Sequence, residues 1–193
     1  KDVWVLNEGP VADTTLLPRS ADVIQLRRTG NNLPSRVADN LFWLGRYAER
    51  AECTARLLRG SLIRLNSETS GSAIALLKPF LQTLEAQHQL PVGRCSVLMR
   101  ATPESLEAEL LDLIIQQEHK GSLRSITEQL QRLGMLVRDR TSNDFWRSIS
   151  TLDDVIATAS KSPDFLIGDG IVLLNQVLLG LASMHGLANE NMT

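Results

Sequence analysis

This sequence of 193 residues has few cysteines, no long apolar run and almost no excess of charge of either sign. Two cysteines, Cys53 and Cys95, are too few for a disulfide framework or a four-cysteine zinc site, and they suit a reducing compartment. Twenty basic against 22 acidic residues give a net charge of -2, which argues against a nucleic-acid partner. The longest apolar candidate, 170–181, contains Asn175 and Gln176 and falls short of the roughly 18 residues of a membrane span. With no signal-peptide pattern at the start, these absences predict a cytoplasmic protein without a membrane partner.

Hydrophobic residues make up 43% of the chain and charged residues 22%, a balance typical of globular proteins. A chain of this length can bury a core without a metal or a disulfide. The sequence begins at Lys1 rather than methionine, in a strand-like stretch. We therefore expect it to be an internal piece of a longer protein.

Residues 1–31 differ from the rest of the chain. The runs 3–6 and 23–26 are short and β-prone, and turn-forming residues follow each of them. Two short strands cannot form a domain alone. We interpret this short, partly extended segment as the tail of a preceding domain.

Helical spacing begins after Leu33, and Ser35 can cap a helix over about 36–66. Apolar residues recur there at alternating steps of four and three, as in heptad repeats. This stripe consists of Val37, Leu41, Leu44, Ala48, Ala51, Ala55, Leu58, Leu62 and Leu65. Three alanines in its middle allow a neighbouring helix to approach closely.

Five more helices are predicted by the same periodicity, which makes the fold class all-α, a bundle of about six helices. They cover about 72–87, 102–118, 121–137, 142–156 and 165–189, with a long loop over 90–101. Thr102 stands at a cap position, Gly121-Ser122 starts the next helix, and Ser142 or Asn143 caps the one after it. The last helix is apolar on most faces, so we expect it to be the most buried.

The first helix carries a second, unusual face opposite the stripe. It consists of Asp39, Phe42, Trp43, Arg46, Glu49, Arg50 and Cys53. Adjacent aromatic residues suggest that this face is at least partly covered. Three interpretations remain open: an internal ion-pair network, an arginine that holds an anionic group of a ligand or partner, or an ordinary exposed face. Arg46 and Glu49 are three residues apart and can pair, whereas Arg50 should meet an acidic group or carbonyls on another helix.

The stretch LPSRVADNLFWLGRYAERAECTARLLR, residues 33–59, resembles the opening of the bacterial alpha-E domain, whose Glu-Arg motif matches Glu49 and Arg50. KDVWVLNEGP and QLRRTGNNLPSR resemble the end of a circularly permuted ATP-grasp domain. The closing LLGLASMHGLANENMT resembles the family's text before a second Glu-Arg helix. The resemblance implies an ATP-grasp tail over 1–31 and an alpha-E-like domain over 32–193 that is truncated at its C-terminus.

The resemblance also implies a setting. Alpha-E domains are expected to work with ATP-grasp amide ligases, transglutaminase-like proteins and Ntn-type amidohydrolases that make or modify peptides. ATP and magnesium would belong to the ATP-grasp part, with no cofactor and no metal in this piece. We expect a non-catalytic module for partner binding or substrate-path shaping, with Asp39, Trp43, Arg46, Glu49 and Arg50 as its candidate residues. The alternatives are an enzyme completed by the missing half of the domain, and a structural or oligomerisation bundle that could form a homodimer.

Other groupings are weaker. Glu85 and His88 have the spacing of a di-iron ligand pair, but no second pair accompanies them, and a histidine at a helix end commonly helps cap carbonyls. Cys53 is interpreted as a packed thiol, because no cysteine-protease signature surrounds it. Five arginines between 124 and 147 alternate with acidic residues, which favours a solvated face.

Overall fold

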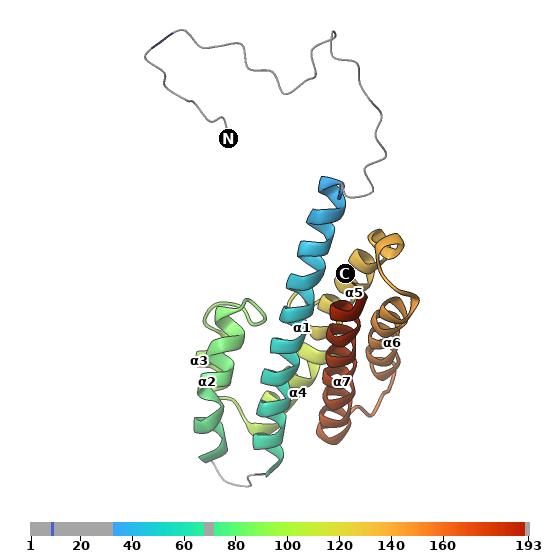
Figure 1. Cartoon of the computed structure of the whole chain (residues 1–193). Coiled ribbons are helices and arrows are strands. Elements are labelled where there is room, and N and C mark those ends of the chain that lie inside the picture. Colours follow the sequence, from blue (N-terminus) through green and yellow to red (C-terminus); the bar gives the residue numbers. More distant parts are fainter. Residues whose placement is uncertain (1–8, 10–32, 68–71, 192–193) are drawn as a thin grey trace, which may run out of the picture. The chain divides into compact units, whose positions relative to one another are not determined.

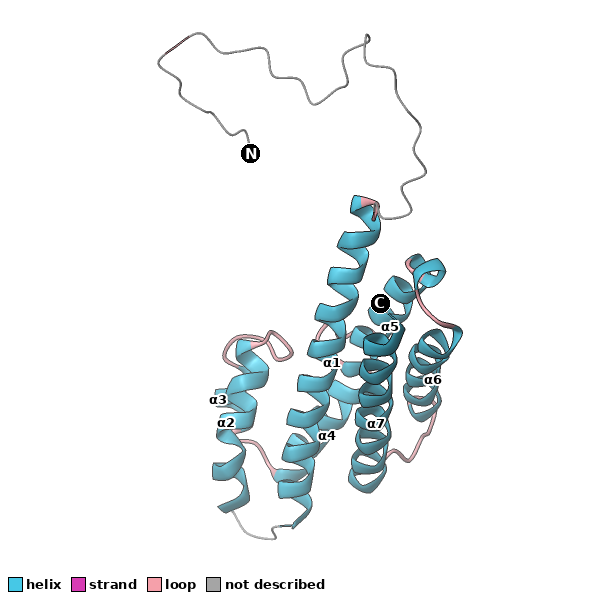
Figure 2. Cartoon of the chain, viewed as in Figure 1, coloured by secondary structure: helices cyan, strands magenta, loops and turns pink. Residues whose placement is uncertain are grey.

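The computed structural model describes residue 9, residues 33–67 and residues 72–191, and it is all-α within them, as the sequence predicts (Figures 1 and 2). The strand candidates in 1–31 lie outside the described residues. The helices are α1 (Ser35–Ser67), α2 (Ser72–Ala86), α3 (Arg94–Leu98), α4 (Pro103–Ile115), α5 (Leu123–Leu136), the short 3-10 helix η1 (Arg138–Arg140), α6 (Asn143–Ala159) and α7 (Ile167–Asn191).

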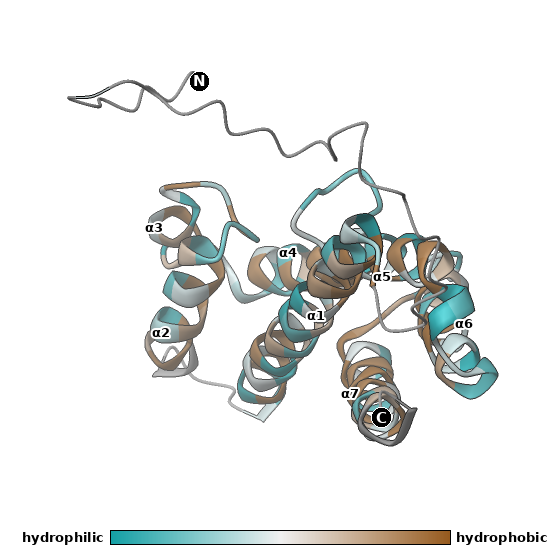
Figure 3. Cartoon of the chain, turned by 45° about the horizontal axis from the view of Figure 1, so that its top comes forward, coloured by the Kyte–Doolittle hydropathy of each residue, from teal (hydrophilic) through white to brown (hydrophobic). Residues whose placement is uncertain are grey.

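Helix α1 is the central element of the bundle. It packs against α2, α4, α5 and α7, and it lies between the α2–α3 pair and α7 (Figures 1 and 3). The predicted stripe is confirmed, because Leu44, Leu58 and Leu62 are buried and the alanines between them lie in the core. Ala51 and Ala55 are fully buried, and their small side chains allow close packing of the neighbouring helices.

Thr102 caps α4 as predicted, Ser122 caps α5 at its predicted start, and Ser142, one of two predicted candidates, caps α6. The hydroxyls of Thr102, Ser122 and Ser142 accept hydrogen bonds from the backbone N–H groups of residues three positions later, at 3.1 to 3.3 Å. Each bond satisfies one N–H that a helix start would otherwise leave without a partner. The starts of α4, α5 and α6 are therefore set by local sequence.

The predicted loop over 90–101 is wrong in part, because it contains helix α3. The carboxylate of Glu85 accepts hydrogen bonds from the backbone N–H groups of Gly93 (2.9 Å) and Cys95 (2.8 Å). Gly93 has a φ of 86°, a left-handed conformation that glycine adopts without a steric cost. Periodicity could not predict this one-turn helix, because its cap comes from a residue on α2.

Helix α7 is less enclosed than its composition suggested. Val172 and Leu179 are 57% and 72% exposed, so the expectation that α7 is the most buried helix is wrong. Figure 3 shows α7 coloured largely as hydrophobic. By length and composition, 167–188 is the one stretch among the described residues that could cross a membrane. Of its most apolar 18 residues, 28% are buried inside the protein. No continuous apolar run marks this stretch in the sequence, because Asn175 and Gln176 interrupt it, yet these two residues change its mean hydropathy little.

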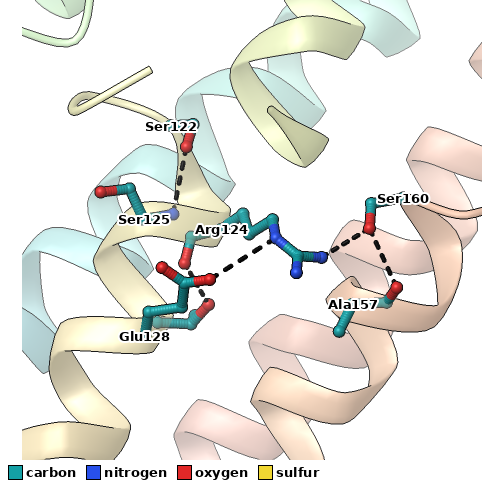
Figure 4. A network of polar contacts seen from close by, with 7 residues as sticks. Ser122, Arg124, Ser125, Glu128, Ala157 and Ser160 are labelled. Atoms are coloured by element: carbon teal, nitrogen blue, oxygen red, sulfur yellow. Dashed lines mark hydrogen bonds and ion pairs between the residues drawn. The ribbon is translucent and has the colours of Figure 1, made fainter. Parts of the chain in front are cut away.

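A polar contact joins α5 to α6 (Figure 4). Arg124 donates to the hydroxyl of Ser160, which in turn donates to the carbonyl of Ala157 at 2.9 Å. The guanidinium also lies 3.6 Å from the carboxylate of Glu128, and the side chain of Arg124 is only 15% exposed. Burial raises the pKa of the nearby Asp153, and the charge of Arg124 opposes that rise. The prediction of a solvated arginine face is therefore wrong for Arg124.

We expect Arg124→Ala to lower the free energy of unfolding by about 2 kcal/mol, because a mostly buried link between two helices is lost. Arg147→Ala is the matched control. Arg147 pairs with Asp144 at 3.2 Å on the surface, and such exposed pairs contribute about 0.5 kcal/mol. Urea unfolding of both variants measures the difference. Equal losses would show that Arg124 is no more than a surface charge.

Candidate functional site

A hollow of about 410 Å³ lies beside α1, and we call it the α1 pocket. It is lined by Trp43, Arg46, Tyr47, Glu49, Arg50, Cys53 and Gln87. Six of these residues come from α1 and recur at helical spacing, so they share one side of that helix. Gln87 directly follows α2 and closes the pocket from the other side.

Four of the five predicted candidates line the α1 pocket: Trp43, Arg46, Glu49 and Arg50. Asp39, the fifth, is exposed one turn earlier and is not a lining residue. Sequence reasoning placed Cys53 on this face as a packed thiol, and it missed Tyr47 and Gln87. Tyr47 follows from the helical spacing, whereas Gln87 is 34 residues beyond Cys53 and carried no signal.

The expectation that this face of α1 is covered is wrong for most of it. Phe42 and Trp43 are 61% and 47% exposed, and the side chains of Arg46 and Glu49 are 62% and 68% exposed. Figure 1 shows the first turns of α1 extending beyond α2 and α3. Neighbouring helices therefore approach this face only from about Arg50 onward. The internal ion-pair network is excluded for Arg46 and Glu49.

The predicted pairing of Arg46 with Glu49 is confirmed. Arg46 Nη1 donates to Glu49 Oε2 at 3.2 Å. Arg50 turns away from Glu49, and its Nη2 donates to the backbone carbonyl of Gln87 at 3.5 Å. The Nε of Arg50 is buried and has no hydrogen-bond partner among the described residues. Arg50 is thus the one arginine of the α1 pocket whose described contacts include no carboxylate.

The turn that carries Gln87 is tied firmly to α1. Gln87 Nε2 donates to Cys53 Sγ at 3.2 Å, which places Cys53 at the base of the α1 pocket. Gln89 is buried, and its side-chain amide lies 2.8 Å from Thr54 Oγ1. Between them His88 has a φ of 61°, which is uncommon for a residue with a side chain. These contacts fix the position of the Gln87 carbonyl that faces Arg50.

The segment after this turn is held by two carboxylates. Hydrogen bonds from the backbone of Gly93, and then of Cys95, lower the pKa of Glu85. The hydrogen bonds and charge of Arg94 lower the pKa of Glu109, against an opposing effect of burial. Arg94 donates two hydrogen bonds to the carboxylate of Glu109, from Nε at 2.9 Å and from Nη2 at 2.7 Å. This bidentate pair joins α3 to α4.

The lowered pKa of Glu109 predicts a pH dependence of stability. A carboxylate whose native pKa lies below its unfolded pKa stabilises the fold above the unfolded value, and this contribution disappears as the pH falls through the native value. We expect Glu109→Gln to lower the melting temperature at pH 7, by an amount that shrinks below about pH 5. Arg94→Gln should show the same loss and the same pH dependence. A deficit of Glu109→Gln that persists unchanged at pH 3 would contradict this.

The described residues contain no group of three or more His, Cys, Asp or Glu side chains that could hold a metal ion. Of the Glu85–His88 pair, Glu85 binds backbone N–H groups and His88 forms the left-handed turn. The α1 pocket offers two guanidinium groups, two aromatic rings and an amide beside the Glu49 carboxylate and the Cys53 thiol, and its arginines suit recognition of an anionic group.

Comparison with protein families identifies the family of this chain. Residues 33–193 match the Alpha-E family, described as a predicted alpha-helical domain with a conserved ER motif, and the chain belongs to this family. Glu49-Arg50 is the single Glu-Arg dipeptide in the sequence, and both residues line the α1 pocket.

Similar chains include the uncharacterized proteins Rv2567 of Mycobacterium tuberculosis H37Rv and Mb2597 of Mycobacterium bovis. Each is 30% identical over 204 residues, and the match covers all of this chain. The chain spans 23% of the length of these relatives. No solved structure matches the chain.

Proposed function

We propose that this Alpha-E domain is a non-catalytic binding module of an ATP-grasp peptide or amide ligase, and that the α1 pocket holds part of a substrate or partner. The observation that carries the proposal is the convergence of Arg46, Glu49 and Arg50 with Trp43 on one hollow. A concave site with a few convergent polar groups is the usual form of a ligand site.

The contacts of the pocket favour binding over catalysis. A cysteine nucleophile needs an adjacent base, usually histidine. Cys53 instead accepts a hydrogen bond from the Gln87 amide, which cannot take up its proton. Glu49 is exposed and paired with Arg46, a setting that does not prepare a carboxylate for acid–base chemistry. These side chains can orient a charged group, and the ligation chemistry would belong to the ATP-grasp part.

The exposed aromatic pair beside the pocket supports a role in contacting another surface. The rings of Phe42 and Trp43 meet edge to face, with centroids 5.5 Å apart, and both remain exposed. Large aromatic side chains and arginine are enriched at the centres of protein interfaces. A neighbouring domain of a longer chain, or its peptide substrate, would cover them.

The test is ligation by the full-length ATP-grasp protein with Glu49→Gln or Arg50→Gln. Glu49→Gln should change the free energy of unfolding by less than about 0.5 kcal/mol, because the pair it breaks is exposed. Arg50→Gln should raise KM about tenfold and leave kcat nearly unchanged, since it removes binding common to substrate and transition state. Arg56→Gln is the matched control on the same helix, because Arg56 pairs with Glu52 outside the pocket.

Two outcomes would contradict the proposal. Unchanged kinetics in both variants would show that the α1 pocket has no part in the reaction. A large fall in kcat with KM unchanged for Glu49→Gln would favour the enzyme alternative, in which the motif takes part in chemistry.

A further inference from the structure

The charges of the α1 pocket do not cancel. Arg46 and Glu49 neutralise each other, which leaves the guanidinium of Arg50 without a carboxylate among the described residues. Within the described part of the chain, its hydrogen bond to the Gln87 carbonyl is long at 3.5 Å, and its buried Nε has no partner. A buried donor without a partner is unfavourable, so a ligand that supplies the missing acceptor binds more tightly.

We infer that Arg50 receives a carboxylate attached to an apolar or aromatic group, such as the C-terminal residue of a peptide. The inference deepens the proposed function and rests on it only in taking the α1 pocket as a binding site. It assigns the anion to Arg50 and not to Arg46, whose guanidinium already holds Glu49.

The atoms that lack good partners define the shape of the anion. The Nε and Nη2 groups form one edge of a guanidinium, and their parallel N–H bonds match the two oxygens of a carboxylate. Arg94 uses this same edge to hold Glu109, with bonds of 2.9 and 2.7 Å. The Nε of Arg50 is covered by protein atoms. For a carboxylate to bind this edge of the guanidinium, the side chain therefore turns away from Gln87 and into the pocket.

The walls of the α1 pocket define the group beside the carboxylate. Trp43 and Tyr47 both line it, with ring centroids 6.5 Å apart and an angle of 50° between the rings. An apolar or aromatic side chain can pack on these rings. A multiply charged phosphate is less suited, because Arg50 is the one cation of the pocket that Glu49 leaves unneutralised, and it can balance only a single negative charge. The volume of about 410 Å³ lies in the range of small-ligand sites.

The experiment titrates the 193-residue chain with N-acetyl-alanyl-phenylalanine and follows binding by calorimetry. The side-chain Nε–H resonance of Arg50 is followed in parallel by nuclear magnetic resonance. We expect saturable binding of the free carboxylate, a shift of the Arg50 resonance, and binding at least tenfold weaker for the C-terminal amide of the same peptide. Inorganic phosphate tests for a general anion site and should bind at least tenfold more weakly.

Two variants and one control assign the contact. Arg50→Gln should weaken binding at least tenfold, and Arg50→Lys should do the same, because it keeps the charge and loses the fork. Arg56→Gln should bind as the unmodified chain does. Circular dichroism of Arg50→Lys checks that the fold is kept, so that weaker binding reports the lost contact.

Equal binding of the acid and its amide, phosphate binding as tight as the peptide, or full binding by Arg50→Lys would each overturn the inference. Its failure is distinguishable from failure of the proposed function. If the peptide acid does not bind but ligation by the full-length protein depends on Arg50, the binding role stands and the carboxylate assignment falls. If the acid binds at Arg50 but ligation is insensitive to Arg50→Gln, the carboxylate assignment stands and the proposed role in ligation falls.

Discussion

Replacing Gly121 with alanine is expected to lower the free energy of unfolding by about 3 kcal/mol, because the new methyl group has no room. A Cβ at this position would lie 2.6 Å from the Cα of Gln89 and 2.7 Å from its carbonyl oxygen. Both are backbone atoms, so rotation of a side chain cannot relieve the clash. Gln89 is anchored to Thr54, and the segment must therefore shift as a whole.

This shift should also reach the α1 pocket, because Gln87 is two residues from Gln89 and lines that pocket. Urea unfolding measures the stability, and titration with the acetylated dipeptide measures the pocket. Gly186→Ala is the matched control. A Cβ at Gly186 meets nothing within 4 Å, and alanine in a helix is favoured over glycine by up to about 1 kcal/mol. If Gly121→Ala were as stable as the unmodified chain, the close approach of Gly121 to Gln89 would be wrong.

Leu58→Ala is expected to cost about 3 kcal/mol of stability, because it empties a site in the middle of the α1 stripe. Leu58 is fully buried, on the helix that packs against α2, α4, α5 and α7. A cavity there removes contacts with surrounding side chains that cannot all move inward.

Ile63→Ala on the same helix is the control. Ile63 is 39% exposed, so its truncation should cost about 1 kcal/mol or less. Both variants should unfold in urea with the slope of the unmodified chain, as expected when the native fold is retained. A similar cost for both would contradict the central place of the stripe.

Much of the fold could be predicted from the sequence because the signals are local. The core positions of α6, Phe145, Ile149, Leu152 and Ile156, recur at helical spacing and are all buried. Ser142 precedes them and caps that helix. Apolar periodicity and a capping hydroxyl each depend on residues within a few positions, so one sequence is enough to interpret them.

The candidate site was predicted only in part. Arg46 and Glu49 pair as their spacing predicts, because both lie on one turn of α1. Their exposure was not predictable, since it depends on how far α2 and α3 extend along α1. Gln87 and Arg124 show the same limit: each makes its decisive contact with a residue at least 34 positions away.

The sequence alone therefore determined the all-α class, the buried stripe of α1, three helix caps and the Glu-Arg motif, because each arises from neighbours along one helix. The tertiary structure decided which face of α1 stays open, where α3 forms and which atoms meet Arg50. Those outcomes depend on where separate helices end and on how they pack together. The α1 pocket exists because α2 ends beside Arg50 and turns through His88, a fact of packing that no local pattern encodes.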